Sequence, residues 1–492
     1  MRKANDEGHC LAYFFYTLIS KFPEISMEVE LKSNDTLPVA VIGAGPVGMA
    51  AAARLIEAGI TPVLLERGNS VGAALLEWGH VRVFSPWKYN VDDVAKRLLD
   101  HNGWATPSPD HLPTGREIVD EYLLPLSHVP AVEQALKLCA TVRTIARQGL
   151  DKVSSKDRSA APFVVRYQDK HGEHEVVVRA VIDASGTWGQ PNPMGVNGIP
   201  VLGERTARGI SCGIPDVIGA RRPDFVGKRT LVVGSGHSAI NVALALLELQ
   251  MANPATEIYW ALRHQGVAKL LGGGLNDQLP ERGSLGLAAK QAMDAGHLKM
   301  LTSFSASKVA SIADRLILTA IANGENMELK LDQIVVATGF RPDFSFLREL
   351  RVEVDPAVEA PPALAPLIDP NLHSCGTVPP HGVDELSHPE KDFYIVGSKS
   401  YGRAPTFLMK TGYEQVRSVV SELAGDHVAA RRVELALPET GVCSATPPTP
   451  TSSGCCGGPA PSAVDACCVA DAEAKSEGRT GCGCGSSKVE SA

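Results

Sequence analysis

Cysteine is scarce over most of this chain and crowded near its end. Of the 11 cysteines in 492 residues, seven fall between Cys443 and Cys484, and the other four stand singly in the preceding sequence. None of these four has the C-x2-C or C-x4-C spacing of a redox-active pair, which excludes the usual disulfide reductase motif. A secreted fold held by disulfides would spread its cysteines through the domain, so we expect a reducing, cytoplasmic setting.

Runs of one charge and long hydrophobic segments are also absent. The net charge is −8, and no cluster of lysine and arginine occurs, which argues against nucleic acid or an anionic membrane as the main partner. The apolar stretch Cys10–Ser20 is too short to cross a bilayer. We therefore expect a small molecule or a metalloid as substrate, in a protein that is either a monomer or a homo-oligomer.

The first 36 residues precede any regular pattern, and two interpretations of them stay open. They form an N-terminal extension, or translation starts at Met27 and residues 1–26 are a start-site artefact. The rest of the chain, 44% hydrophobic overall, is long enough to bury two or three separate cores.

A glycine-rich motif follows the first regular apolar segment. The stretch "VIGAGPVGMA" places Gly43, Gly45 and Gly48 in G-x-G-x-x-G spacing between a predicted strand and an alanine-rich helix. The first glycine permits a tight turn, the second lets a pyrophosphate approach backbone N–H groups, and the third allows close packing of the helix. Glu66, at the end of the next predicted strand, is expected to accept hydrogen bonds from ribose hydroxyls. We predict FAD at this motif, because it stands early in a long chain.

A second motif of the same kind occurs about 190 residues later. The stretch "LVVGSGHSAINVA" places Gly234, Gly236 and Ala239 in G-x-G-x-x-A spacing, again between a strand and a helix. The following strand ends in "WALRH" and carries no acidic residue there, whereas Arg263 could meet a 2′-phosphate. This favours NADPH over NADH. Two dinucleotide motifs in one chain predict hydride transfer between a nicotinamide and a flavin.

Three further segments resemble one family of proteins. The segments Asp224–Leu246, Val335–Asp343 and Ala180–Gly195 are similar to flavoproteins with two dinucleotide-binding domains, especially flavin-containing and class B-like monooxygenases. The resemblance covers roughly residues 38–425. Two serines depart from its usual pattern, Ser185 in place of threonine and Ser398 in place of an aspartate that binds the flavin ribityl chain.

The resemblance implies a fold and further site residues. It implies an α/β protein with two Rossmann-like three-layer domains, the NADP domain inserted in the FAD domain. A helix from Ala404 to Leu423 would point its N-terminus at the flavin. Trp78 and His80 become candidates for the active site, and Cys212 is a further candidate because, among the four cysteines before the tail, it is the one near a plausible active-site loop. The remaining expected cofactor contacts are Arg67, Arg82, Val142, Gly186, Gly339 and Gly397.

The expected domain divisions are residues 1–36, an N-terminal extension; 37–196, the first part of the FAD domain; 197–334, the NADP domain; 335–432, the second part of the FAD domain; and 433–492, the tail.

The tail after about Arg432 is rich in small residues and proline, so we predict that it is disordered. Its cysteines are paired and suit soft, thiophilic ions better than zinc, because no histidine accompanies them. The candidate ligands of a metalloid such as As(III) are Cys455, Cys456, Cys467, Cys468, Cys482 and Cys484. Tail and body together resemble the flavin-dependent monooxygenase-like proteins of arsenic-resistance operons. A low-complexity tail with incidental metal affinity is the alternative.

Three hypotheses for function remain. In the first, NADPH and FAD support an oxygen-dependent oxidation of a soft centre such as arsenite captured by the tail. In the second, electrons pass from the flavin to a tail disulfide and on to a metalloid or thiol. In the third, the chain is a cofactor-binding scaffold whose tail buffers metalloids.

Overall fold

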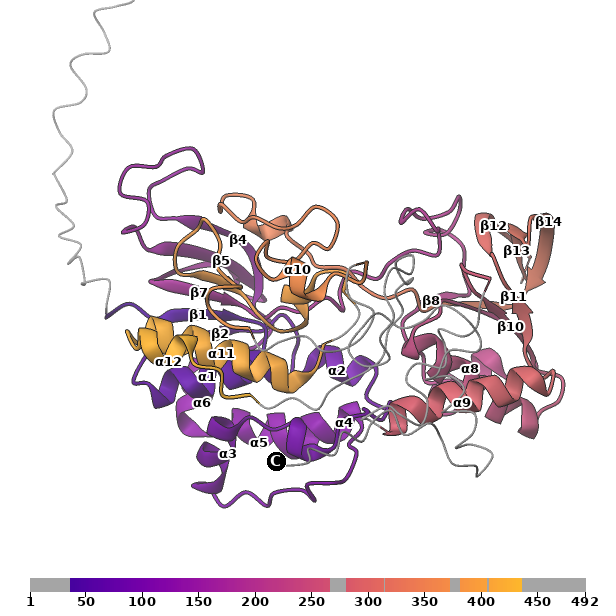
Figure 1. Ribbon diagram of the computed structural model, residues 1–492, viewed down its shortest axis with the longest axis horizontal. Coiled ribbons are helices and arrows are strands. Elements are labelled where there is room, and N and C mark those ends of the chain that lie inside the picture. Colours follow the sequence, from indigo (N-terminus) through magenta and orange to yellow (C-terminus); the bar gives the residue numbers. More distant parts are fainter. Residues whose placement is uncertain (1–35, 266–279, 314, 372–380, 405–406, 436–492) are drawn as a thin grey trace, which may run out of the picture.

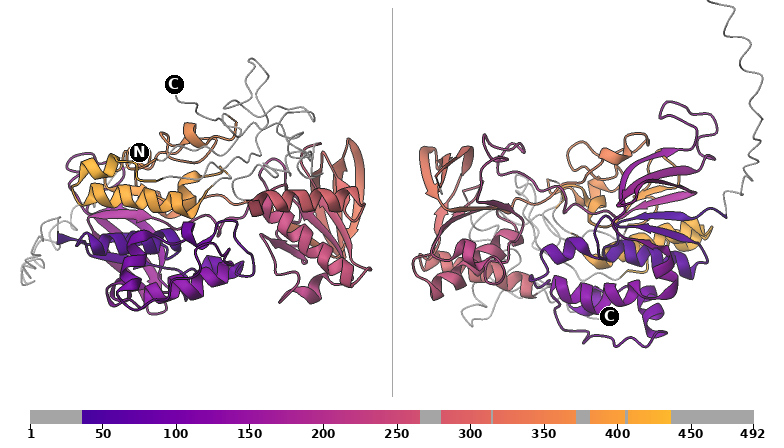
Figure 2. Two further views of the ribbon diagram at one scale, coloured as in Figure 1. Left: turned by 60° about the horizontal axis from the view of Figure 1, so that its bottom comes forward. Right: turned by 180° about the vertical axis from the view of Figure 1, so that it is seen from behind.

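A computed structural model describes residues 36–265, 280–313, 315–371, 381–404 and 407–435, without the side chains of residues 280–283. Within these residues the chain forms two parallel sheets, each accompanied by a three-stranded antiparallel sheet. Figure 1 shows the two assemblies side by side, and Figure 2 shows the same separation from two other directions.

The first parallel sheet contains strands from both ends of the described sequence. Its strand order is β16 (Phe393–Ile395), β7 (Ala180–Asp183), β1 (Val39–Ile42), β2 (Pro62–Leu65) and β3 (Leu136–Lys137). The antiparallel sheet beside it consists of β4 (Thr141–Arg147), β5 (Phe163–Asp169) and β6 (Gly172–Val178). In the chain, all strands of the second assembly lie between β7 and β16.

The second parallel sheet repeats this arrangement. Its strand order is β11 (Lys299–Leu301), β10 (Glu257–Ala261), β9 (Arg229–Val233), β15 (Gln333–Val336) and β8 (Ile210–Cys212). The accompanying antiparallel sheet consists of β12 (Ser305–Ile312), β13 (Arg315–Ala322) and β14 (Glu325–Leu331). These observations support a mixed α/β fold of Rossmann-like type with parallel sheets.

Helices cover one face of each parallel sheet, as Figure 1 shows for α1 and α11. Beside the first sheet lie α1 (Pro46–Glu57), α2 (Ala73–Glu77), α3 (Asp93–Asp100), α4 (Gly115–Ile118), α5 (Leu124–Ser127), α6 (Pro130–Ala135), α10 (Ala365–Ile368), α11 (Met409–Leu423) and α12 (His427–Arg431). With the second sheet belong α7 (Arg222–Phe225), α8 (His237–Ala252) and α9 (Pro280–Asp294). Short 3₁₀ helices are η2 (Trp87–Tyr89), η6 (Ser345–Leu347) and η7 (Gly397–Tyr401), and one π turn, η3, spans Val119–Leu123.

Alternating side chains bury both faces of each parallel sheet. In β1, Val39 and Val41 pack with the helices, whereas Ala40 and Ile42 pack against β4 and β5. In β9, Val232 faces the helix side and Leu231 and Val233 face β12–β14. Strands buried on both faces read as continuous apolar runs, which is why their alternation was invisible in the sequence.

The two assemblies are joined by two crossing segments that pair with each other. Pro191 and Phe340 form an antiparallel bridge, and the Asn192 amide donates to the Gly339 carbonyl at 2.9 Å. The expected boundary between residues 334 and 335 falls inside β15, whose pairing with β8 and β9 places it in the second sheet. The chain therefore leaves the second sheet only after Val336.

Two predicted helices differ from those observed. The sequence pattern predicts one helix from Gly115 to about Ala140, but in the structure the helical stretch ends at Ala135 and is divided, because Pro125 and Pro130 each lack the N–H that a continuous helix needs. The helix expected from Ala404 begins at Met409 instead.

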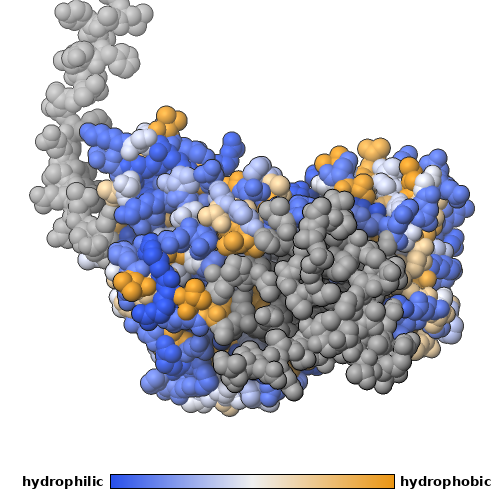
Figure 3. Space-filling model, viewed as in Figure 1, coloured by the Kyte–Doolittle hydropathy of each residue, from blue (hydrophilic) through white to orange (hydrophobic). Residues whose placement is uncertain are grey.

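On the face shown in Figure 3, the described residues are mainly hydrophilic, with hydrophobic residues in small separate patches. Among the helices of the described residues, none combines the length and hydrophobicity that crossing a membrane requires.

Candidate functional site

The first glycine turn connects β1 to α1. Gly43 has a φ of +96°, and a Cβ at Gly48 would lie 1.9 Å from the Gly43 carbonyl oxygen, so both positions need glycine. A Cβ at Gly45 would meet no protein atom within 4 Å. Gly45 precedes α1, which has no side-chain cap and no acidic residue in its first turn. The turn thus offers free N–H groups and open space to an anion.

Glu66 is buried beside this turn. One of its carboxylate oxygens accepts the Ala44 N–H and the other accepts the Gly68 N–H, each at 2.7 Å. A carboxylate has about four lone-pair positions, so two remain for ribose hydroxyls. The contact with ribose itself remains a prediction.

The second glycine turn connects β9 to α8. Gly234 has a φ of +135°, and a Cβ there would lie 2.2 Å from the Ala337 carbonyl oxygen. A Cβ at Gly236 would again meet no protein atom within 4 Å, and α8 has no side-chain cap. The buried Trp260 donates from Nε1 to the Gly234 carbonyl at 2.8 Å, and this hydrogen bond holds the backbone of the turn in place.

Basic residues follow β10 in the second sheet, whereas Glu66 follows β2, the corresponding strand of the first sheet. Arg263 and His264 are exposed, and Arg263 Nε lies 3.4 Å from His264 Nε2. This end of the strand can receive a phosphate, whereas a buried carboxylate would repel one. The NADP contact assigned to Arg263 stays a prediction.

Three predicted contacts gather where β7 and β16 end. Gly186 has a φ of +69°, and a Cβ there would lie 3.6 Å from Ser398 Oγ. Gly397 donates its N–H to Gln415 Oε1 at 2.7 Å. The guanidinium of Arg67 lies over Gly189, 2.7 Å from the position of a Cβ. The chain therefore brings these residues to the same sheet edge as the first glycine turn.

Three other predicted contacts take part in the protein's own structure. Arg82 is exposed and donates to the Leu112 carbonyl, and Val142 lies on β4 and packs partly against its core. Gly339 has a φ of +88° in the crossing segment, where its carbonyl accepts the Asn192 N–H. The cofactor contacts assigned to these three residues stay predictions.

Aromatic side chains occupy the joint between the two assemblies. Trp188 stacks on Phe340 with ring centroids 4.4 Å apart, and Trp78 lies 6.4 Å from Trp188. Trp188 Nε1 donates to Glu77 Oε2 at 2.7 Å. A Cβ at Gly213 would lie 2.9 Å from Trp188, so the loop after β8 packs directly against this ring. The sequence singled out Trp78 but missed Trp188 and Phe340.

Two histidines also lie at the joint. The Phe84 ring is 5.0 Å from that of His237, the first residue of α8. His80 lies near Asp216 in the loop after β8; partial burial lowers the pKa of His80, and the Asp216 carboxylate opposes this effect. Thus His80 faces the second assembly, and its imidazole is biased toward the neutral form, which can accept a proton.

Cys212 ends β8 and is free and exposed. Although part of Cys212 is exposed, protein atoms around its thiol desolvate the sulfur, and this effect, with a smaller contribution from the Glu204 carboxylate, raises the pKa of the Cys212 thiol. A thiol that stays protonated is a poor nucleophile, so the environment of Cys212 does not favour a redox role.

The candidate metalloid ligands in the tail lie outside the described residues. Within residues 36–435, apart from the gaps given above, no group of three or more histidine, cysteine, aspartate or glutamate residues could hold a metal ion.

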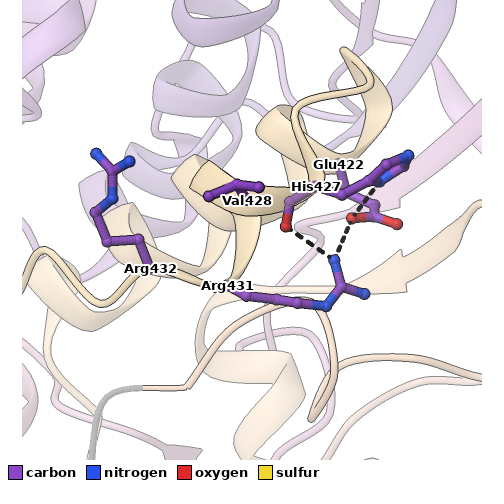
Figure 4. Close-up of a pocket in the computed structure, with 5 residues that line it drawn as sticks. All are labelled: Glu422, His427, Val428, Arg431 and Arg432. Atoms are coloured by element: carbon purple, nitrogen blue, oxygen red, sulfur yellow. Dashed lines mark hydrogen bonds and ion pairs between the residues drawn. The ribbon is translucent and has the colours of Figure 1, made fainter.

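A surface pocket at the far end of α11 does not belong to this site. Figure 4 shows Arg431 between Glu422 and His427, to which its guanidinium is joined by an ion pair and a hydrogen bond. The pocket is lined by Glu422 near the end of α11, by His427, Val428 and Arg431 of α12, and by Arg432, which directly follows α12. Glu422 forms ion pairs with His427 and Arg431 inside the pocket, Arg432 pairs instead with Glu434, and neither glycine turn lines the pocket.

Sequence reasoning missed a buried ion pair at the carboxyl ends of β7 and β16 in the first sheet. Lys399 Nζ lies 2.7 Å from Asp183 Oδ2, and both side chains are 0% exposed. The signals available were an aspartate ending the apolar strand "AVID" and a lysine following "YIVGS". Each is an isolated charge next to a buried strand, but neither reveals its partner.

Solved structures of similar fold include reductases and monooxygenases. Bacillithiol disulfide reductase from Bacillus cereus matches with a TM-score of 0.57 and 19% identity, covering 79% of this chain and 99% of that one. The cadaverine monooxygenase DfoA from Erwinia amylovora matches with a TM-score of 0.56 and 12% identity, covering 85% and 99%. At these identities the likeness concerns the fold.

Sequence comparison gives one curated relative and a family. Indole-3-pyruvate monooxygenase YUCCA6 from Arabidopsis thaliana is 26% identical over 214 residues, which are 42% of this chain and 44% of that protein. The chain thus spans less than half the length of this relative. The family model for pyridine nucleotide-disulphide oxidoreductases matches residues 37–362, about two thirds of the chain, and the protein therefore belongs to the pyridine nucleotide-disulphide oxidoreductase family.

Proposed function

We propose that the protein is an NADPH-dependent FAD oxidoreductase of the monooxygenase-like kind, with FAD at the first glycine turn and NADPH at the second. The observation that carries the proposal is the pair of open glycines, Gly45 and Gly236. Each precedes an uncapped helix at the end of a parallel strand. Such an N-terminus binds pyrophosphate through its N–H groups and its dipole.

The residues fit the two dinucleotides differently. At the first turn, Glu66 keeps lone pairs for ribose hydroxyls, and no 2′-phosphate could approach its carboxylate. At the second, the exposed Arg263 supplies a cation where a 2′-phosphate would lie. The inserted NADP domain would then comprise the second assembly. Bound FAD would supply the ability to accept a hydride and to pass its electrons onward.

The joint suits an oxygenase better than a dithiol reductase. No C-x2-C pair occurs in the chain, and the raised pKa of Cys212 disfavours thiolate chemistry there. Trp188, Phe340 and Trp78 would exclude water between the two nucleotides. The curated relative, a monooxygenase, supports the same choice.

The proposal extends to the substrate, which we expect to be arsenite. Tail cysteines such as Cys455 and Cys456 would capture arsenite and deliver it to the joint. This part rests only on the chemistry of paired thiols and on the resemblance of the tail, because these residues lie outside those described and the named similar proteins give no support for it.

The first experiment measures cofactor content and oxygen uptake of the full-length protein. We expect FAD to be released on denaturation, NADPH to be oxidised faster than NADH, and arsenite to stimulate oxygen-dependent NADPH oxidation. Equal oxygen uptake with and without arsenite in FAD-loaded protein would contradict the arsenic role but leave the oxidoreductase intact.

An anaerobic titration tests the reductase alternative. If electrons pass to a tail disulfide, the protein takes up more NADPH than its flavin requires, and a variant truncated after Arg432 loses this excess. Uptake equal to the flavin content in both proteins would support the monooxygenase-like proposal.

A further inference from the structure

The ion pair between Asp183 and Lys399 stands at the place where the first sheet ends. Asp183 is the last residue of β7, and Lys399 belongs to η7, which follows β16. Their charged atoms are 2.7 Å apart with neither side chain exposed. Replacing a buried ion pair by apolar residues is often neutral or stabilising, so stability alone gives little reason to keep one here.

Ser185 connects this buried pair to the surface. Its hydroxyl lies 2.6 Å from Asp183 Oδ1, and Lys399 Nζ lies 3.1 Å from its Oγ, while Ser185 itself is exposed. An ionised carboxylate can only accept and an ammonium can only donate. The Ser185 proton is therefore directed to Asp183, one lone pair receives Lys399, and a second lone pair remains.

The exposed hydroxyl lies beside the first glycine turn. A Cβ at Gly43 would lie 3.0 Å from the Cα of Ser185, and the next residue, Gly186, approaches Ser398. This edge is also the point where the sheet order reverses, because β2 lies on one side of β1 and β7 on the other. Ligands of open parallel sheets bind at such a point.

The surroundings of the pair keep its charges in place. The rings of Phe346 and Phe344 lie 4.5 and 5.4 Å from Lys399 Nζ and shield it from water. Burial lowers the pKa of His388, a neighbour of Asp183, to about 4. The imidazole is therefore neutral at pH 7 and does not compete with Lys399 for the carboxylate.

We propose that Asp183 and Lys399 are positioning residues that hold the Ser185 hydroxyl as a hydrogen-bond acceptor for the bound flavin nucleotide. The ligand group that meets Ser185 is then a donor, a hydroxyl or an N–H. Both occur in FAD, in the ribityl chain and in the flavin ring. The inference rests on the proposed binding of FAD at the first turn.

The experiment titrates FAD into apoprotein and follows flavin fluorescence. Ser185→Ala is expected to weaken FAD binding about tenfold, as for one lost hydrogen bond, whereas Ser185→Thr keeps the hydroxyl and stays within about twofold of the wild type. Ser185→Thr should unfold at the wild-type temperature, whereas Ser185→Ala, which removes a hydrogen bond to each member of the buried pair, should unfold only a few degrees lower.

A double variant separates positioning from stability. Lys399→Met with Asp183→Asn removes both charges, so its apoprotein should unfold within about 4 °C of the wild type. It is nevertheless expected to bind FAD about tenfold more weakly, with a shifted flavin absorption spectrum. An amide can donate as well as accept, so the Ser185 proton is no longer held toward position 183 and the hydroxyl no longer presents a fixed lone pair to the ligand. Glu390→Gln is the matched control: it breaks a buried ion pair with Arg147 elsewhere in the first assembly and should lower the unfolding temperature without changing the flavin spectrum.

Two outcomes are decisive and distinguishable. If wild-type apoprotein binds FAD and both Ser185→Ala and the double variant bind it equally well with unchanged spectra, the pair is structural and the inference fails alone. If wild-type apoprotein binds no FAD, the proposed function fails and the inference falls with it.

Discussion

The two glycine turns are built alike, yet they differ at the positions that face a ligand. Each starts with a glycine of positive φ, continues with an open glycine, and leads into an uncapped helix. The strand beside the first turn, β2, is followed by the buried Glu66, whereas the strand beside the second, β10, is followed two residues later by the exposed Arg263. The scaffold thus offers a pyrophosphate site twice, and one side chain in each copy distinguishes the rest of the nucleotide.

The third position of the two motifs differs in how closely the helix approaches. A Cβ added at Gly48 would lie only 1.9 Å from the Gly43 carbonyl oxygen, whereas Ala239, at the same position of the second motif, already carries a Cβ and is fully buried. The first turn is therefore the tighter one, and it tolerates less change.

Substituting alanine for Gly48, compared with glycine for Ala239, gives the largest expected difference in unfolding free energy. Gly48→Ala should cost about 4 kcal/mol of unfolding free energy, above the usual range for overpacking because the obstructing atom is backbone, and should abolish FAD retention. Ala239→Gly should cost only about 1 kcal/mol, the difference in helix propensity. Urea unfolding measures both. Equal costs would mean that the two helices approach their turns equally closely.

Ion pairs sharpen the comparison of the two assemblies. Glu390 accepts from Arg147 and Arg158 with its carboxylate 1% exposed, whereas the pair of Glu257 with Lys299 in the second assembly is about half exposed. Glu390→Gln should cost about 3 kcal/mol, because two arginines lose a buried partner. Glu257→Gln should cost about 0.5 kcal/mol or less.

The same carboxylate predicts a pH dependence. Burial alone would raise the pKa of Glu390, but hydrogen bonds from Arg158, the Arg351 amide and Arg147 hold it below its ordinary value. A lowered pKa stabilises the folded state above the pKa of the unfolded chain, and this stabilisation is lost as the pH falls through the folded-state value. Unfolding between pH 7 and pH 3 should therefore show a shallower loss of stability in Glu390→Gln than in the wild type. Parallel curves would remove Glu390 as the cause.

The open glycines test whether both turns bind nucleotides. Gly236→Asp adds a side chain and a negative charge where no protein atom lies within 4 Å, so the fold should persist while the KM for NADPH rises about 100-fold, or about 2.7 kcal/mol. FAD content should not change. Gly45→Asp should show the reverse pattern, with FAD lost. If Gly236→Asp lowers the FAD content instead, the assignment of the two turns is reversed.

Arg263 gives the smallest expected effect. Arg263→Ala should reduce the preference for NADPH over NADH about tenfold, or 1.4 kcal/mol, by removing a cation from the 2′-phosphate. Arg263→Lys keeps the charge and should retain most of the preference. The comparison of kcat/KM for the two nucleotides measures this, and an unchanged ratio would remove Arg263 from the nucleotide site.

Local patterns predicted much of the fold and the cofactor part of the site. The strand, glycine turn and helix at residues 39–57 and 229–252 follow from spacing and hydrophobic pattern within a single short segment. Local patterns failed where a proline divided a helix after Gly115 and where β15 had to be assigned to one sheet or the other. The second choice depends on pairing with β8 and β9, which are about 120 and 100 residues away.

By itself, the sequence determined that two glycine turns exist. It also determined that a glutamate follows the strand next to the first turn and an arginine the strand next to the second, because these features arise from neighbours in the chain. Only the tertiary structure decided that Lys399 meets Asp183, 216 residues away, or that Trp188 packs on Phe340 at the joint. A lone lysine or tryptophan in a sequence carries no record of its partner. The partner is selected by the order of strands in a sheet, which brings the ends of β7 and β16 side by side.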